Sequence, residues 1–242
     1  MNRRTFLKTA AASAAVPFVG CQTRSAPMPR RPNVLFLLSD DQRFDTLHAL
    51  GNADIRTPHL DRLAARGTAL THAHIMGGDN GAICICSRAM LLTGRSLWRA
   101  PHEPAPDLPL WPEVFRQAGY TTFGTGKWHN GPATYARCFG AGGSIFFGGM
   151  NDHLKVPVYD FAPDGKYPAS RRHVVKEFSS ELFSDAAIRF LRETKGDKPF
   201  FAYVSYTAPH DPRMAPEEYK AMYPPEKVPV PPWIRMAVAT AR

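Results

Sequence analysis

The fold class follows from the segment Asn33-Val34-Leu35-Phe36-Leu37-Leu38-Ser39-Asp40-Asp41. Its first seven residues form a nearly continuous apolar run, which is the pattern of a strand buried on both faces of a parallel sheet. Two adjacent carboxylates follow directly where this strand ends. Ligands of open α/β sheets gather beyond the carboxyl ends of the strands. The segment therefore predicts a buried strand and one edge of a ligand site.

Strand and helix patterns alternate along the rest of the chain. We predict helices over residues 57–66, 87–93, 110–118 and 179–193, and strands around 120–123 and over 199–206. The alternation predicts an α/β sandwich around a largely parallel central sheet flanked by helices. Residues 140–172 are rich in Gly and Pro with little periodicity, so we interpret them as a long functional insertion or surface excursion.

Apolar periodicity also predicts which helix faces pack inward. On the first helix the inner face would be formed by Leu60, Leu63 and Ala64. On the helix over 179–193 the apolar residues are Leu182, Phe183, Ala186, Ile188 and Phe190.

Length and composition indicate a globular protein. The 242 residues have room for one sizeable domain or two small ones, and 44% hydrophobic residues can form a core. The 30 Lys and Arg against 21 Asp and Glu give a net charge of +9, which favours anionic partners. No zinc-finger spacing, RNA-binding aromatic motif or concentrated basic helix is present, which argues against nucleic acid. Sulfated polymers are an anionic alternative.

The first residues have the form of an export signal. Asn2-Arg3-Arg4-Thr5-Phe6-Leu7-Lys8 contains paired arginines and precedes a mostly apolar stretch over 9–19, which is too short to span a bilayer. This combination is typical of a twin-arginine (Tat) signal over residues 1–21, with an amphipathic basic N-terminus as the alternative. Phe18-Val19-Gly20-Cys21 resembles a lipoprotein processing site that would acylate Cys21, and simple cleavage is the competing interpretation. Residues 22–31 are interpreted as a linker.

The cysteine count favours chemistry over disulfides. Cysteines occur at positions 21, 84, 86 and 138. If Cys21 is lipidated or removed, three remain, and an odd number cannot form a complete disulfide framework.

Three polar clusters follow predicted strands. They are Asp40-Asp41, Gly126-Lys127-Trp128-His129 and Pro209-His210-Asp211-Pro212. Taken singly, each has an ordinary structural explanation: a turn or helix-cap pair, a surface lysine beside a satisfied histidine, and a rigid turn. Together they predict one converging site, in which the acidic pair would bind Ca²⁺ or Mg²⁺ through oxygen.

The segment Cys84-Ile85-Cys86-Ser87-Arg88-Ala89-Met90-Leu91-Leu92-Thr93-Gly94-Arg95 places a cysteine at a helix start, where backbone N–H groups favour an anion. It resembles the sulfatase signature Cys-x-Pro-Ser-Arg-x-x-x-Leu-Thr-Gly-Arg, whose first cysteine is oxidised to formylglycine. Further resemblances lie, in the family's order between about residues 32 and 232, at 32–41, 57–64, 126–129 and 208–210.

The resemblance implies a fold, an activity and a cofactor. It implies an alkaline-phosphatase-like α/β sandwich and a sulfuric ester hydrolase, arylsulfatase-like, that cleaves sulfated polysaccharides or aryl sulfates. Ca²⁺ would be bound by Asp40, Asp41 and an oxygen of the formylglycine made from Cys84. A hydrated aldehyde carries two hydroxyls, of which one attacks sulfur and the other later allows sulfate to be expelled.

Other catalytic roles are carried over by the same resemblance. Arg88 would hold the hydrated aldehyde. Lys127 and His210 would neutralise sulfate oxygens or assist the leaving alcohol. His129 would manage the proton of the second hydroxyl, and the sequence leaves open which histidine is acid and which is base.

The sequence departs from the family pattern at Cys86, where Pro or Ala is usual. Maturation enzymes read this motif, so a Cys84/Cys86 redox or metal-thiolate pair stays an alternative to a modified Cys84. The partners implied are a formylglycine-generating enzyme, the Tat translocon and a sulfated substrate. The location implied is periplasmic, or membrane-anchored through a lipid on Cys21.

The family pattern fades towards the C-terminus. We expect a partial N-terminal catalytic domain over 32–232 and an off-pattern tail over 233–242. The downstream Asp-Asn or Asp-His block that completes the family's metal site is not found, so a truncated, frameshifted or partial product is expected. Two rival functions stay open: a phosphoesterase of the same superfamily, and a catalytically impaired protein that binds sulfated glycans.

Overall fold

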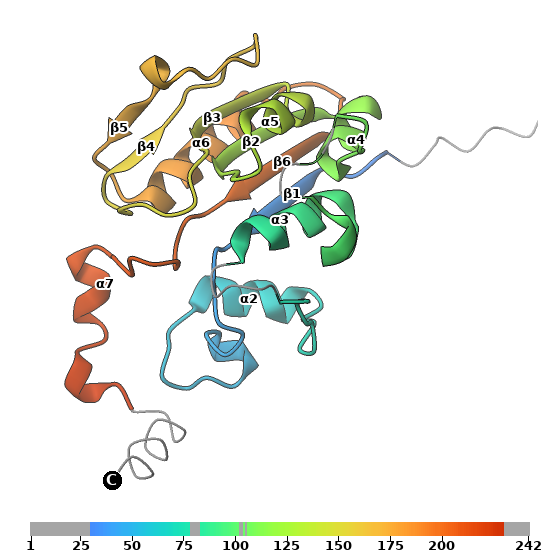
Figure 1. Cartoon of the computed structure of the whole chain (residues 1–242). Coiled ribbons are helices and arrows are strands. Elements are labelled where there is room, and N and C mark those ends of the chain that lie inside the picture. Colours follow the sequence, from blue (N-terminus) through green and yellow to red (C-terminus); the bar gives the residue numbers. More distant parts are fainter. Residues whose placement is uncertain (1–29, 78–82, 102–103, 105, 230–242) are drawn as a thin grey trace, which may run out of the picture. The chain divides into compact units, whose positions relative to one another are not determined.

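The computed structural model describes residues 30–77, 83–101, 104 and 106–229. Its centre is a four-stranded sheet with the order β1-β6-β2-β3, in which every neighbouring pair runs parallel (Figure 1). The strands are β1 (Val34–Leu38), β6 (Phe200–Ser205), β2 (Thr121–Lys127) and β3 (Ala141–Phe146). The predicted α/β class with a parallel central sheet is confirmed.

The two middle strands bury almost every side chain, as expected of strands covered on both faces. The register of β2 against β3 shifts between Thr125 and Gly126. Gly126 has a φ of 82°, and a Cβ atom there would lie 1.9 Å from the carbonyl oxygen of Ser205 on β6. Only glycine fits this close approach, and the irregularity lies directly before Lys127, the last residue of β2.

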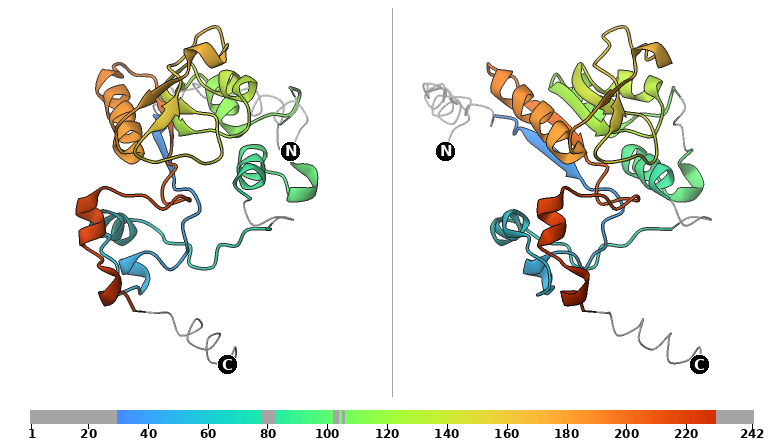
Figure 2. Two further views of the ribbon diagram at one scale, coloured as in Figure 1. Left: turned by 60° about the vertical axis from the view of Figure 1, so that its left-hand side comes forward. Right: turned by 90° about the vertical axis from the view of Figure 1, so that its left-hand side faces the viewer.

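Helices cover both faces of the sheet (Figure 2). One face packs against α3 (Cys84–Thr93), α4 (Trp111–Gln117) and α5 (Pro132–Cys138). The other packs against α6 (Ser179–Glu193), which contacts β2, β3 and β6.

The two cores are rich in aromatic side chains. On the α4 side, the Trp111 ring lies edge-on to Phe36 at 5.1 Å and to Phe201 at 4.9 Å. On the α6 side, Phe123 stacks on Phe190 at 4.5 Å. Each buried ring contributes about 1.5–3 kcal/mol through burial, and such pairs add about 0.5–1.5 kcal/mol. These contacts fix the strands whose carboxyl ends carry the polar clusters.

The remaining elements lie outside the central sheet. Strands β4 (Val156–Val158) and β5 (His173–Val175) form an antiparallel pair, and Tyr159 bridges to Ile145 of β3. The other helices, with 3₁₀ helices labelled η, are η1 (His48–Leu50), α2 (Pro58–Arg66), η2 (Leu97–Arg99), η3 (Ala169–Arg171), α7 (Glu217–Ala221) and η4 (Pro225–Lys227).

The prediction that the first strand is buried on both faces is wrong. β1 lies at the edge of the described sheet, and Leu35 and Leu37 on its outer face are 49% and 48% exposed. A continuous apolar run therefore does not distinguish an edge strand from a central one.

Several other predicted details are also wrong. Residues 140–172 are not a single insertion, because they begin with β3, a strand of the central sheet. Strand β2 continues to Lys127, beyond the predicted end at 123. The α2 helix buries none of its residues within the described chain, and Leu63, predicted to face inward, is 62% exposed. On α6, Ile188 is exposed, because the face that packs on the sheet carries Phe183, Ala187 and Phe190 instead.

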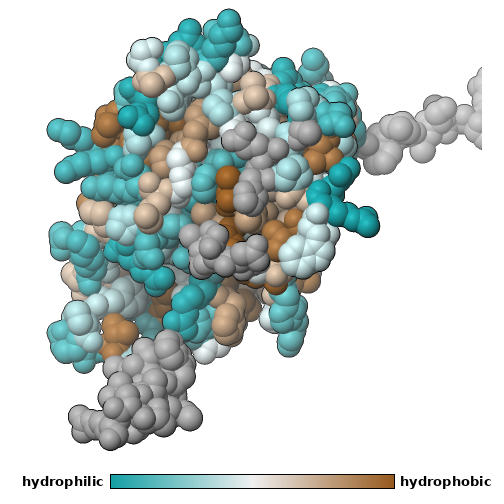
Figure 3. Space-filling model, in the orientation of Figure 1, coloured by the Kyte–Doolittle hydropathy of each residue, from teal (hydrophilic) through white to brown (hydrophobic). Residues whose placement is uncertain are grey.

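Hydrophobic side chains also occur among hydrophilic ones on the surface (Figure 3). The most exposed of them include Phe44, Leu70 and Trp98. Within the residues that the structure describes, no helix is long and apolar enough to cross a bilayer.

Candidate active site

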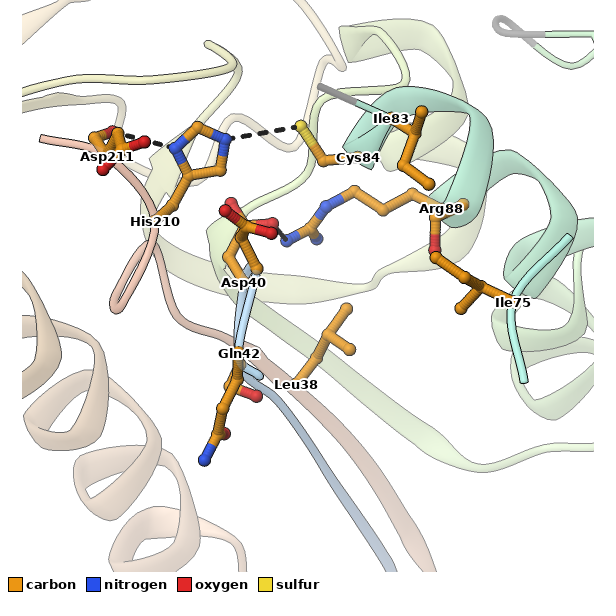
Figure 4. Close-up of a pocket in the computed structure, with 12 residues that line it drawn as sticks. Leu38, Asp40, Gln42, Ile75, Ile83, Cys84, Arg88, His210 and Asp211 are labelled. Atoms are coloured by element: carbon orange, nitrogen blue, oxygen red, sulfur yellow. Dashed lines mark hydrogen bonds and ion pairs between the residues drawn. The ribbon is translucent and has the colours of Figure 1, made fainter. Parts of the chain in front are cut away.

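Two of the three predicted polar clusters, those at Asp40-Asp41 and at His210-Asp211, line one cavity of about 390 Å³ together with the start of α3 (Figure 4). Asp40 and Asp41 follow β1, Cys84 and Arg88 lie on α3, and His210 follows β6; all five line the cavity. Lys127, the last residue of β2, reaches the same group from the protein interior.

Asp40 and Lys127 form a buried ion pair. Asp40 is 4% exposed and Lys127 is fully buried, and the Lys127 ammonium donates to the Asp40 carboxylate. The ammonium also donates to the backbone carbonyl of Gly149. A buried charge is tolerated only when it is paired and hydrogen-bonded, and both conditions hold here.

Cys84 is the first residue of α3, where backbone N–H groups have no partner within the helix. Its Sγ lies 3.3 Å from Lys127 Nζ and 3.9 Å from His210 Nε2. The other ring nitrogen of His210, Nδ1, lies 2.8 Å from the carbonyl oxygen of Asp211. A carbonyl only accepts, so Nδ1 carries a proton, and Nε2 of the neutral ring is an acceptor facing residue 84.

Arg88 lies one turn after Cys84 on α3 and is 3% exposed. Its Nη1 donates to the carbonyl of Lys127 at 2.8 Å and to Ser205 Oγ at 2.7 Å. Its Nη2 lies 3.5 Å from Asp40 Oδ1, and neither Nη2 nor Nε makes a hydrogen bond to the described residues. These two buried donors fit an additional oxygen ligand in the site.

His129 lies two residues beyond β2 with a φ of 68°. Its ring packs so closely on Gly149 that a Cβ atom there would lie 2.9 Å from two ring atoms. Burial, with the positive charges of Lys127 and Arg88, lowers the pKa of His129 from 6.5 to about 4. Its Nδ1 is buried without a hydrogen-bond partner among the described residues, so the neutral ring has an unused polar atom.

The fit to a metal ion depends on the atom at residue 84. Asp40, Cys84 and His210 each offer one ligand atom, and the three atoms lie within 4.8 Å of one another. Asp41 lines the cavity but is not in this group. Sulfur and imidazole are softer than Ca²⁺ prefers, since it takes roughly six to eight oxygens. An oxygen at residue 84 and the two aspartates would fit a hard cation, as part of such a shell.

Two partners in the site were not predicted. The hydroxyl of Ser205 and the carbonyl of Gly149 anchor Arg88 and Lys127, respectively. Ser205 lies near the end of the strand predicted over 199–206 and shortly before the His210 cluster, which is a usable signal. Gly149 lies in a segment without periodicity, and nothing in its local sequence points to the site. Cys21, the predicted lipidation position, lies outside the described residues.

Comparison with protein families identifies the chain. The family model described as Sulfatase matches residues 32–230. The chain belongs to the sulfatase family. This sulfatase chain also carries, at residues 1–20, a match to the twin-arginine translocation pathway signal sequence, which supports Tat export.

Curated relatives and solved structures agree with this membership. The chain is 31% identical over 214 residues to an ulvan-active sulfatase of Formosa agariphila, covering 83% of this chain and 40% of that protein. It is 29% identical over 211 residues to an N-acetylglucosamine-6-O-sulfatase of Bacteroides thetaiotaomicron, covering 81% and 34%. A solved structure in complex with its substrate D-glucosamine-2-N,6-O-disulfate matches with a TM-score of 0.68 and 26% identity, covering 84% of this chain and 39% of that one. This sulfatase chain thus spans two fifths or less of the length of each of these proteins.

Proposed function

We propose that the chain contributes the nucleophile-bearing part of a sulfuric ester hydrolase that cleaves sulfate esters of sulfated polysaccharides. The observation that carries the proposal is the meeting of Cys84 with Lys127 and His210 at the start of α3. The substrate class is supported by relatives that act on ulvan or N-acetylglucosamine sulfate, and by a similar structure that binds a glucosamine disulfate.

The proposed cofactors are one Ca²⁺ and a formylglycine made from Cys84. Asp40, Asp41 and the residue-84 oxygen would hold the cation. When bound, these groups would supply an activated oxygen nucleophile and a Lewis acid for the sulfate oxygens.

The charged side chains around residue 84 would stabilise the sulfate group. The Lys127 ammonium lies 3.3 Å from the residue-84 side chain, and the two Arg88 nitrogens that make no hydrogen bond to the described residues lie in the same buried cluster. Positive charge held in a water-poor site stabilises developing negative charge without reorganisation. We therefore assign Lys127 to a sulfate oxygen and Arg88 to the oxygen of residue 84.

The two histidines would move protons. His210 holds its Nδ1 proton on the Asp211 carbonyl and presents Nε2 to residue 84, a geometry suited to exchange a proton with the leaving alcohol. His129 has a lowered pKa because it is buried near cations, and a bound sulfate would offset those charges. We assign His129 to the proton of the residue-84 side chain during sulfate release.

Export by the Tat system would deliver the folded protein to the periplasm, or to a membrane surface if Cys21 is acylated. A formylglycine-generating enzyme would act before export, while Cys84 is accessible to it.

Two neighbouring cysteines give a matched test. Cys84→Ala removes the proposed nucleophile, whereas Cys86→Ala introduces a residue that the sulfatase motif accepts. We expect Cys84→Ala to abolish turnover of an aryl sulfate and Cys86→Ala to preserve it. Undiminished turnover by Cys84→Ala would refute the assignment, and faster turnover of an aryl phosphate by the unsubstituted protein would favour a phosphoesterase.

A further inference from the structure

A third histidine near the site, His153, is hydrogen-bonded to the backbone of His210. His153 is 2% exposed and lies in the segment between β3 and β4. Its Nε2 lies 2.8 Å from the carbonyl oxygen of His210, and its Nδ1 lies 2.9 Å from Thr207 Oγ1. Because a carbonyl only accepts, Nε2 carries a proton and donates it to His210.

Rigid elements hold the His153 ring in place. Thr207 follows β6 and is 4% exposed, and its hydroxyl lies 2.9 Å from the hydroxyl of Ser179, the first residue of α6. The backbone N–H of Ser179 donates to the carbonyl of His153 at 2.8 Å. The imidazole is thus fixed against the start of α6 and the end of β6, and every side chain of the network is buried.

The same segment also reaches the other side of the active site. Gly149, four residues before His153, accepts a hydrogen bond from Lys127. Gly149 also packs against the His129 ring, where a Cβ atom would lie 2.9 Å from two ring atoms. The stretch from Gly149 to His153 therefore joins the Lys127 side of the site to the His210 side.

The loop that carries His210 is held at its start, where the backbone N–H of Asp40 donates to the carbonyl of Ala208 at 3.2 Å, and the bond from His153 holds it two residues further on. Pro209, Asp211 and Pro212 are exposed, and the His210 ring bonds within its own loop, to Asp211. The bond from His153 reaches the backbone of the residue whose Nε2 lies 3.9 Å from Cys84 Sγ, so it is placed where it can orient the His210 side chain.

We propose that His153 is a positioning residue of the sulfatase reaction: its Nε2–H holds the His210 carbonyl and thereby aims the His210 imidazole at residue 84. The proposal rests on the proposed function. The competing explanation is that His153 only stabilises the core, as a buried histidine with satisfied ring nitrogens does.

Two substitutions separate the bonds of the His153 ring. In His153→Gln the amide nitrogen takes the place of Nε2 and keeps the bond to His210. In His153→Asn the shorter amide reaches only the place of Nδ1, so the bond to Thr207 stays and the bond to His210 is lost. A purely structural role predicts that both variants lose stability and keep the kcat of the unsubstituted protein.

The first measurement is aryl sulfate hydrolysis, with kcat and KM determined separately. We expect kcat to fall about 10-fold or more in His153→Asn, with a smaller change in KM, and to stay within about 3-fold in His153→Gln. Tyr135→Phe, which removes a buried hydrogen bond on α5, is the control and should keep its kcat. Equal kcat values in the Asn and Gln variants would overturn the proposal.

The second measurement, amide hydrogen exchange, needs no activity. We expect faster exchange in the peptide covering residues 207–213 of His153→Asn, unchanged exchange there in His153→Gln, and unchanged protection of α6 in both. If the unsubstituted protein hydrolyses no sulfate ester, the proposed function fails, and equal exchange in the two variants would separately refute the role of His153.

Discussion

Lys127→Met gives the sharpest test of the buried charge cluster. Lys127 is fully buried, and its ammonium contacts Asp40, Cys84 and the Gly149 carbonyl. Methionine keeps most of the side-chain volume and removes the charge. Among the described residues this leaves Arg88, at 3.5 Å, as the remaining ion-pair partner of the buried Asp40 carboxylate. Removing one partner of a buried ion pair costs about 3–5 kcal/mol.

The expected loss is large enough to measure directly. For a domain of this size, about 3–5 kcal/mol corresponds to a decrease in Tm of roughly 6–20 °C. Urea denaturation followed by circular dichroism gives the free energy of unfolding, and a thermal scan gives Tm. The matched control is Lys220→Met on α7, which breaks an ion pair with Glu217 whose side chains are 49% and 87% exposed. That substitution should cost less than about 1 kcal/mol.

A double-substitution cycle isolates the interaction itself. Asp40→Asn replaces the carboxylate by a neutral amide, which needs no cation as a partner. Lys127→Met should therefore lower the free energy of unfolding much less in that background. A Lys127→Met protein as stable as the Lys220→Met control, or equal costs in both backgrounds, would refute the buried contact between Lys127 and Asp40.

Three further predictions concern titration and packing. Stability should rise as pH increases from about 4 to 6.5, because unfolded His129 binds a proton in this range and the folded ring does not; His129→Gln should flatten this part of a urea-denaturation series. Burial raises the pKa of Cys138, so iodoacetamide in mildly alkaline buffer should leave it unlabelled in the native protein and label it in urea, as peptide mass spectrometry would show. Tyr135→Phe removes a 2.8 Å bond to the Gly124 carbonyl and should lower the unfolding free energy by about 1 kcal/mol in urea denaturation; no change would mean that the bond contributes nothing net.

The sequence predicts the elements that carry long hydrophobic patterns, but it does not predict that β1 lies at the sheet edge with one face exposed. The helix over 179–193 is found with the predicted bounds, and the apolar run at 33–39 forms β1. Both signals come from long, unambiguous hydrophobic patterns. The α3 helix begins at Cys84, three residues before the predicted start. The sequence does not indicate this start, because Cys-Ile-Cys carries no cap signal.

Other features depend on tertiary contacts that no local pattern encodes. The Ala-Gly-Gly-Ser sequence of β3 has weak strand propensity, and the strand forms because it pairs with β2. The α2 helix has an apolar face that the described chain leaves exposed. Periodicity alone therefore wrongly predicted that this face packs inward.

The candidate site shows the same division. The sequence predicts the site residues that follow strands, namely Asp40, Lys127 and His210, because parallel strands bring their carboxyl ends to one edge of the sheet. Gly149 and His153 take part through backbone and buried side-chain hydrogen bonds across the chain, and only the structure reveals them.

The proposed activity depends on the maturation of residue 84 from a thiol to an aldehyde. The direct measurement is mass spectrometry of the peptide containing Cys84 from protein that hydrolyses an aryl sulfate, with a hydrazide probe to trap aldehydes. We predict the mass of formylglycine at position 84, an adduct with the probe, and no adduct in Cys84→Ala. An active protein in which Cys84 is an unmodified thiol would contradict this dependence.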